Sequence, residues 1–370
     1  MSDAVNRRGF LRSAAAASAT FALRRVSDRW RLHAQTAPAG RRRIFEITTR
    51  IEILQPSGPT RVWVPTPLSA APYQETLGDT YHLGDDGRSV MVENEDVDML
   101  VAEWPAGAAP MLTLTSRVAT MGHAANLTEP TVAPPLNLDV FSRFLRPTRL
   151  IPTDGIVKET AATITRGAGT DLEKARAIYE WIVDNTFRDP KTIGCGTGDI
   201  RFMLESKNLS GKCADLNSLF VGLARASGVP ARDVWGLRVA KSDSGLRSLG
   251  LSSDNASKAQ HCRAEVYLVG YGWVPVDPAD VRKAALDEPP GNLPLSDERI
   301  RDARARLFGS WEMNWIAYNV AHDVALPGSK HGRPLPYLMY PQCETANRRL
   351  DSLDPESFSY EITVREASPE

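Results

Sequence analysis

The stretch GKCADLNSLFVGLARASGVPAR (residues 211–232) decides the fold, because it reads as a helix with a cysteine at its start. A helix is predicted from Gly211 or Lys212, since apolar residues recur on one face at helical spacing. The Gly-Val-Pro sequence at 228–230 ends it. The segments before it are also helical in pattern, and strands follow it, which predicts an α+β fold for this part of the chain.

Cys213 occupies the first turn of this predicted helix. Unpaired backbone N–H groups, the helix dipole and the neighbouring Lys212 all favour an anion there, so they lower the pKa of a thiol. Helical phase places Cys213 at the end of the buried face, pointing toward whatever the helix packs against. Taken alone, Cys213 could equally be a small core residue.

A second stretch, QHCRAEVYLVGYGWVPVDPAD (residues 260–280), predicts two antiparallel strands around a glycine turn. Strand alternation puts His261, Arg263, Glu265 and Tyr267 on one face and Cys262, Ala264, Val266 and Leu268 on the other. The second set is apolar and defines the core side. Cys262 therefore points away from the imidazole of His261 and is expected to fill the core.

The position of Asp277 depends on the register of this hairpin. A tight turn centred on Tyr271 sets Asp277 opposite Glu265, too far from His261 for a hydrogen bond. A longer loop centred near Val269, or a bulge, sets Asp277 opposite His261. The sequence permits both arrangements.

Together these two stretches resemble the core of the transglutaminase-like superfamily, over roughly residues 155–280. The resemblance implies a papain-like fold, in which a helix-borne cysteine packs on an antiparallel sheet. It implies Cys213 as nucleophile, His261 as base and Asp277 as the residue that orients the imidazole. The family's usual His-Ala-Trp sequence is here His261-Cys262-Arg263. Arg263 therefore binds a substrate carboxylate, pairs in the neighbourhood of Glu265, or lies on the surface without a role.

The region before this core has a different pattern. Residues 43–54 alternate around β-branched side chains, and shorter runs of the same kind follow up to residue 119. They predict an all-β sandwich, which resembles the domain that often precedes this core in bacteria. We expect a leader at 1–40, a β-rich domain with a Pro-rich linker at 41–150, and a catalytic domain with a C-terminal extension at 151–370.

The N-terminus resembles a twin-arginine export signal, with Asn6-Arg7-Arg8-Gly9-Phe10-Leu11-Arg12 before an Ala-rich run. It predicts an exported, periplasmic protein, although a disordered basic leader is the alternative. The first 40 residues carry a charge of +5, and since the whole chain carries −1, the rest carries −6. A mildly acidic body gives no reason to expect nucleic acid, and no later apolar run approaches the ~20 residues of a membrane span.

Four cysteines in 370 residues, without a C-x-x-C pair, predict neither a zinc ribbon nor a disulfide framework, although one disulfide remains possible. We expect no metal and no cofactor.

The prediction is a hydrolase of peptide or other amide bonds in peptide or protein substrates, acting through an acyl-enzyme. The alternatives are a protein-glutamine or other acyl transferase and a non-catalytic envelope binding module. The backbone N–H of Cys213 is the first expected oxyanion donor, and the candidates for the second are Trp181, Asn208 and Gln260.

Overall fold

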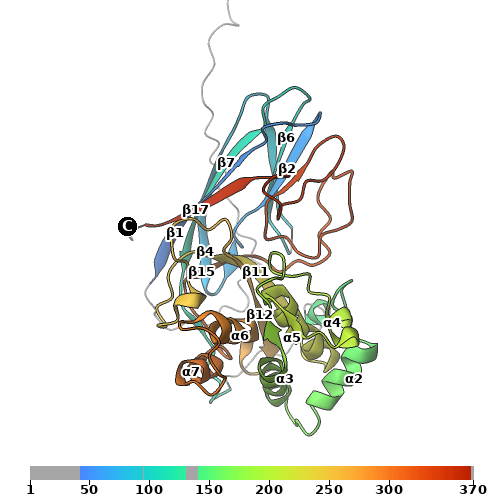
Figure 1. Cartoon of the computed structure of the whole chain (residues 1–370), viewed down its shortest axis with the longest axis vertical. Helices are drawn as coiled ribbons and strands as arrows, with labels where there is room; N and C mark the ends of the chain where they lie inside the picture. Colours follow the sequence, from blue (N-terminus) through green and yellow to red (C-terminus); the bar gives the residue numbers. More distant parts are fainter. Residues whose placement is uncertain (1–41, 95, 131–140, 368–370) are drawn as a thin grey trace, which may run out of the picture.

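The computed structural model describes residues 42–94, 96–130 and 141–367. Figure 1 shows a sandwich of strands at one end of the molecule and a cluster of helices at the other. The predicted leader and residues 131–140 of the predicted linker lie outside the described residues.

Two antiparallel sheets form the sandwich, with the strand orders β17-β1-β7-β4-β3 and β16-β2-β6-β5. Ile51 and Leu112 of the first sheet share a buried cluster with Val62 and Trp104 of the second. The predicted sandwich is therefore confirmed. The strands are β1 (Arg43–Glu52), β2 (Thr60–Pro65), β3 (Ala70–Ala71), β4 (Gln74–Leu83), β5 (Arg88–Val92), β6 (Met99–Trp104), β7 (Met111–Thr120), β16 (Gln342–Glu344) and β17 (Tyr360–Ala367).

The C-terminal part of the chain returns to this sandwich. β17 pairs antiparallel with β1, and β16 pairs antiparallel with β2. Residues 342–367 thus complete both N-terminal sheets, although more than 200 residues separate them from their partners in sequence. The boundary expected near residue 150 stays a prediction.

The second unit is a four-stranded antiparallel sheet in the order β13-β12-β11-β15, with helices on one face. Its strands are β11 (Ala231–Arg238), β12 (Gln260–Leu268), β13 (Gly272–Val276) and β15 (Trp315–Asn319). The helix α5 (Cys213–Ala226) packs directly on β11 and β12. The predicted α+β core, with a helix-borne cysteine on an antiparallel sheet, is confirmed.

The other helices contact α5, except α7 (Glu298–Arg306), which packs on α6 (Pro278–Asp287). Thr170 starts α3 with both bonds of a capping box, because its hydroxyl accepts from the Glu173 N–H and the Glu173 carboxylate accepts from the Thr170 N–H. The sequence analysis missed α4 and α6. The helices are α2 (Gly155–Ile164), α3 (Asp171–Asn185), α4 (Ile200–Ser206), α6 (Pro278–Asp287) and α7 (Glu298–Arg306), with short 3₁₀ turns at Arg143–Leu145 and Arg247–Leu249.

Two short strand pairs lie outside these main sheets. β9 (Phe187–Arg188) pairs with β10 (Ser210–Gly211), and β14 (Ser310–Trp311) pairs with β8 (His123–Ala124).

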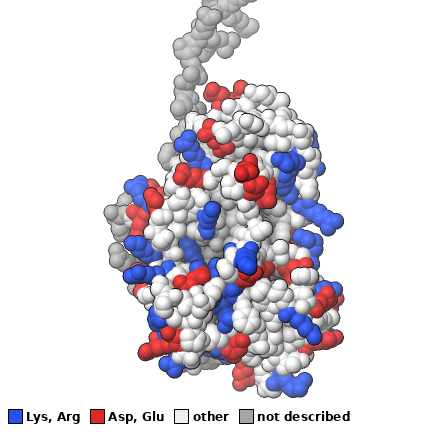
Figure 2. Space-filling view, in the orientation of Figure 1, with Lys and Arg blue, Asp and Glu red and all other residues white. Residues whose placement is uncertain are grey.

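Among the described residues, no helix has the length and apolar character needed to cross a membrane. Figure 2 shows basic and acidic side chains interspersed over the face in view.

Candidate active site

Cys213 is the first residue of α5, the central helix of the second unit. Its backbone N–H belongs to the first turn, where N–H groups have no partner within the helix. The side chain is buried in the cluster between α5 and the sheet. Cys213 therefore combines the positive end of a 14-residue helix with a desolvated site.

Asp215 organises the start of this helix. One carboxylate oxygen accepts from the backbone N–H of Lys212 at 2.9 Å, and the other accepts from Thr197 and Gly198 at 3.0 Å each. The loop that contains Cys195 is thereby fixed against the first turn of α5. The sequence analysis missed this role, although an acidic residue two positions after the cysteine, in the first turn, is a capping signal.

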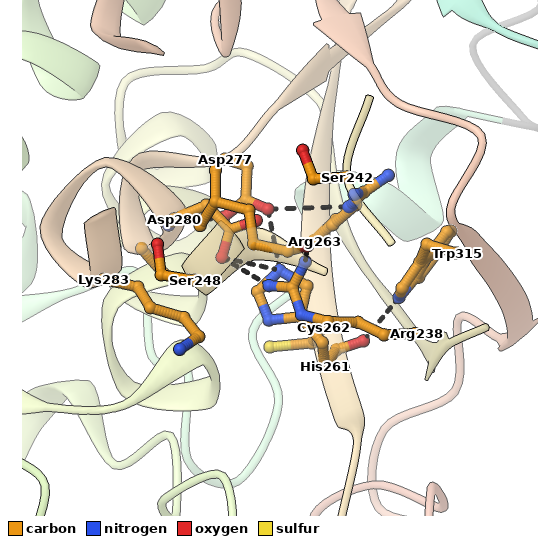
Figure 3. A network of polar contacts seen from close by, with 12 residues as sticks. Arg238, Ser242, Ser248, His261, Cys262, Arg263, Asp277, Asp280, Lys283 and Trp315 are labelled. Atoms are coloured by element: carbon orange, nitrogen blue, oxygen red, sulfur yellow. Dashed lines mark hydrogen bonds and ion pairs between the residues drawn. The ribbon is translucent and has the colours of Figure 1, made fainter. Parts of the chain in front are cut away.

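His261 and Asp277 make a direct polar contact (Figure 3). His261 Nε2 lies 2.8 Å from Asp277 Oδ2, and both side chains are buried. In the β12–β13 ladder Ala264 faces Val276, so continuing that register places Asp277 opposite Arg263, between the two registers that the sequence permits. The contact forms diagonally, because Asp277 already leaves the strand as the N-cap of α6.

The Asp277 carboxylate has two tasks. Its Oδ1 accepts from the backbone N–H of Asp280 at 3.0 Å and caps α6, while its Oδ2 holds the imidazole. Pro278 occupies the first helical position, where its missing N–H costs nothing. The Asp-Pro pair at 277–278 is the sequence signal that would have predicted α6.

Asn217 lies one turn after Cys213 and connects three elements. Its amide nitrogen donates to the backbone oxygen of Cys262 at 2.9 Å and to Asp277 Oδ1 at 3.2 Å. Its oxygen accepts from the Ala279 N–H at 3.3 Å. Asn217 therefore fixes α5 relative to β12 and α6, and the sequence analysis did not identify it.

Three neighbours determine the state of the Cys213 thiol. The neighbouring Cys195 and Cys262 thiols, with a further contribution from His261, favour the thiolate, outweigh burial and hold the Cys213 pKa well below its usual value. The Cys262 side chain fills the core as predicted. It also interacts with Cys213, which strand alternation alone did not reveal.

Buried charges tune the imidazole. Burial and Arg238 lower the pKa of His261, but Asp280 and Asp277 raise it by more, so the net shift is upward. Asp280 is itself paired with Arg238 at 2.5 Å, and despite burial this guanidinium keeps the Asp280 pKa below its usual value. A raised His261 pKa and a lowered Cys213 pKa favour a thiolate–imidazolium pair.

Arg263 is buried, which corrects the expectation that it lies on the surface without a role. It is only 2% exposed and lies over the Trp311 and Trp315 rings, with its Nε 3.6 Å from Asp277 Oδ2. Burial and Asp280 raise the Asp277 pKa, while His261 and Arg263 oppose the shift. The surface reading was wrong because the polar face of β12 is covered by the aromatic residues around β14 and β15.

His261, Asp277 and Asp280 have ligand atoms within 4.8 Å of one another, as a metal site requires. However, Arg238 binds Asp280 and Arg263 approaches Asp277, so two guanidinium groups already neutralise the carboxylates. A cation added to this cluster would meet two fixed positive charges. The residues fit an ion-pair network that positions His261 and do not fit a metal centre.

The three candidate oxyanion donors differ in their surroundings. Asn208 is exposed, and its side-chain oxygen binds Ser210. Trp181 is partly buried at the edge of the core. Gln260 is buried, its Nε2 makes no hydrogen bond among the described residues, and its backbone oxygen accepts from the Cys195 thiol at 3.3 Å. Gln260 is the candidate whose donor is free beside the site.

Comparison with known proteins now adds to this geometry. A sequence model described as the transglutaminase-like superfamily matches residues 158–278, which contain Cys213, His261 and Asp277. The chain belongs to the transglutaminase-like superfamily. An uncharacterized protein of Haemophilus influenzae is 35% identical over 343 residues, which cover 87% of this chain and 91% of that protein.

A solved structure supports the fold. A candidate cysteine protease from Cytophaga hutchinsonii is 17% identical, with a TM-score of 0.50 over 88% of this chain and 98% of its own. The periplasmic domain of TgpA from Pseudomonas aeruginosa is 16% identical, with a TM-score of 0.33 over 68% of this chain and 93% of that domain. For this transglutaminase-like chain, the comparisons support a cysteine-based enzyme in general terms.

Proposed function

We propose that this chain is a thiol hydrolase that cleaves amide or peptide bonds through a Cys213 acyl-enzyme. The observation that carries the proposal is the imidazole of His261, held at 2.8 Å by Asp277 and interacting with a cysteine at a helix N-terminus. Nucleophile, base and orienting carboxylate are the three parts that thiol acyl transfer needs.

The first half of the reaction follows from the two ring nitrogens of His261. Because Nε2 faces Asp277, Nδ1 is the nitrogen available to the Cys213 proton. The thiolate attacks the carbonyl carbon, the imidazolium gives its proton to the leaving amine, and a thioester remains on Cys213. The backbone N–H of Cys213 and the free amide of Gln260 are the donors we assign to the oxyanion.

The second half decides between hydrolysis and transfer. His261 removes a proton from an incoming water or amine, which attacks the thioester and releases Cys213. Hydrolysis is the default because water is always present, whereas a transferase has to exclude it. Protein-glutamine or other acyl transfer is the alternative within the same mechanism.

A non-catalytic envelope binding module is the alternative from another class. The buried network of Arg238, Asp280 and Arg263 around the imidazole speaks against it. Such a network is costly to desolvate, and its arrangement serves to fix the charge and orientation of His261.

We also propose that the protein is exported by the twin-arginine pathway, on the strength of Arg7 and Arg8. Fractionation of cells that express the full chain should find it in the periplasm, and the R7K/R8K variant should remain in the cytoplasm. The R24K/R25K variant is the matched control, because it changes two arginines outside the signal motif. Periplasmic R7K/R8K protein would contradict this pathway.

The catalytic proposal is tested by product analysis on a periplasmic peptide mixture with an added fluorescent amine. Wild-type protein should release new peptide termini, visible by mass spectrometry, and incorporate little of the amine. The Cys213→Ala variant should do neither, with Cys343→Ala as a control that changes a thiol in the sandwich. Dominant amine incorporation would replace hydrolysis by transfer, and identical products from wild type and Cys213→Ala would overturn the enzymatic proposal.

A further inference from the structure

Three buried cysteines from different elements meet at the proposed nucleophile. Cys213 begins α5, Cys262 lies within β12, and Cys195 belongs to the loop between β9 and α4. All three share one core cluster, and both flanking thiols interact with the Cys213 sulfur. The mechanism above needs only one of these sulfurs.

The backbone brings Cys195 directly beside the nucleophile. The N–H of Ala214, the residue after Cys213, donates to the Cys195 carbonyl at 2.9 Å. The Cys195 thiol in turn donates to the backbone oxygen of Gln260 at 3.3 Å, next to His261. A disulfide requires Cα atoms about 4.4–6.8 Å apart, and the hydrogen bond from Ala214 holds the Cys195 backbone against the residue that follows Cys213.

Cys195 and Cys262 differ in their backbone surroundings. Cys262 lies in a central strand, opposite Trp235 of β11, and its carbonyl is held by Asn217. Cys195 lies in no helix or strand, between Gly194 and Gly196, whose φ values are +57° and +94°. Cys262 has to keep the ladder geometry of β12, whereas no strand ladder constrains the Cys195 torsions that a disulfide requires.

We propose that Cys195 is a resolving thiol, which forms a reversible disulfide with Cys213 when a peroxide oxidises the nucleophile. The Cys213 thiolate attacks one peroxide oxygen, forms a sulfenic acid and releases the other oxygen as water after protonation. The Cys195 sulfur then displaces the sulfenic oxygen as a second water, with the thiol proton. Overall, two thiols and one hydrogen peroxide give one disulfide and two waters.

The disulfide would switch off the enzyme and protect it. It removes the nucleophile reversibly, and it prevents further oxidation of Cys213 to the irreversible sulfinic acid. The inference that the disulfide abolishes activity rests on the proposed function of Cys213 as the nucleophile. The bond itself is measured without any substrate.

The test is hydrogen peroxide treatment of the full-length protein, followed by peptide mapping under non-reducing conditions. Wild-type protein should lose two hydrogens in a peptide linking Cys195 to Cys213, and dithiothreitol should reverse the change. The Cys195→Ser variant should instead gain oxygen on Cys213, in a form that dithiothreitol does not remove. Cys262→Ser and Cys343→Ser should still form the Cys195–Cys213 link.

The outcomes separate this inference from the catalytic one. A Cys213–Cys262 link, or equal accumulation of oxygenated Cys213 in wild type and Cys195→Ser, would overturn the resolving role even if reduced Cys213 reacts first with iodoacetamide. If reduced Cys213 shows no preferential alkylation, the nucleophile assignment fails instead. Alkylation of Cys213 should fall more than about tenfold in oxidised wild type and recover on reduction.

Discussion

His261 Nε2 lies 2.8 Å from Asp277 Oδ2, although the β12–β13 register sets Asp277 opposite Arg263. The contact exists because Asp277 ends a strand and caps a helix at the same time. The orientation of the imidazole therefore depends on residues that hold this junction and on the charges around it.

Arg263 should act through Asp277. Replacing it by methionine removes a cation 3.6 Å from the carboxylate, so the Asp277 pKa should rise further and Asp277 should become protonated at higher pH. Protonated Asp277 no longer stabilises the imidazolium, so the acid limb of Cys213 alkylation by iodoacetamide should move to higher pH by about one unit. Arg263→Lys keeps the positive charge, so this variant should shift the acid limb of the alkylation profile less than Arg263→Met does. An unshifted acid limb in Arg263→Met would remove Arg263 from the account.

Asn217 should matter for both stability and reactivity. Asn217→Ala leaves the Cys262 carbonyl and the Ala279 N–H without their partner in a buried site, at a cost of about 1–3 kcal/mol in the free energy of unfolding. Iodoacetamide should also alkylate Cys213 more slowly in this variant, because α5 is held less firmly against β12 and α6. Asn185→Ala removes a comparable hydrogen bond at the surface, to the Trp181 carbonyl, and should change neither quantity appreciably. Equal effects of the two variants in urea denaturation would refute the special role of Asn217.

Gly196 should be intolerant of any side chain. Its φ is +94°, and a Cβ atom there would overlap the Asp215 carboxylate that fixes the start of α5. Gly228 has a similar φ of +81° but open space around it, so Gly228→Ala measures the backbone strain alone, about 1–2 kcal/mol. Gly196→Ala should lose more stability than this and should slow alkylation of Cys213. Equal losses of stability in the two variants would show that the contact with Asp215 is unimportant.

Glu265 should stabilise the covered face of β12. It pairs with Arg232 at 2.6 Å, so Glu265→Ala, which deprives a buried guanidinium of its carboxylate, should cost about 3 kcal/mol. Burial raises the Glu265 pKa, but Arg232 and His123 lower it by more, so the net shift is downward. This stability is therefore present above the unfolded pKa and is lost as pH falls through the folded pKa. The near-isosteric Glu265→Gln variant should lose less stability than Glu265→Ala. Its loss of stability relative to wild type should shrink as the pH falls. A deficit that does not depend on pH would contradict the ion pair.

The sequence predicted the parts of this fold that local patterns control. Strand alternation correctly placed Cys262 in the core, and helical periodicity correctly predicted α5 with Cys213 in its first turn. The sequence did not determine the β12–β13 register that positions Asp277. This register depends on the exact length of the turn between the strands, and strand alternation gives no information about that length. The burial of Arg263 was missed for a different reason. The side chains that cover it come from distant segments, whose pairing a single sequence does not reveal.

The central claim is that Cys213 is the activated thiol and that His261 and Asp277 activate it. Its most direct test is iodoacetamide labelling of the reduced protein at about pH 6 with peptide mapping, because only a thiol with a lowered pKa reacts rapidly there. Cys213 should be labelled before Cys195, Cys262 or Cys343, and both His261→Ala and Asp277→Ala should slow that labelling at least about tenfold. Equal or preferred labelling of Cys262, or a rate at Cys213 that is unchanged in His261→Ala, would contradict the account.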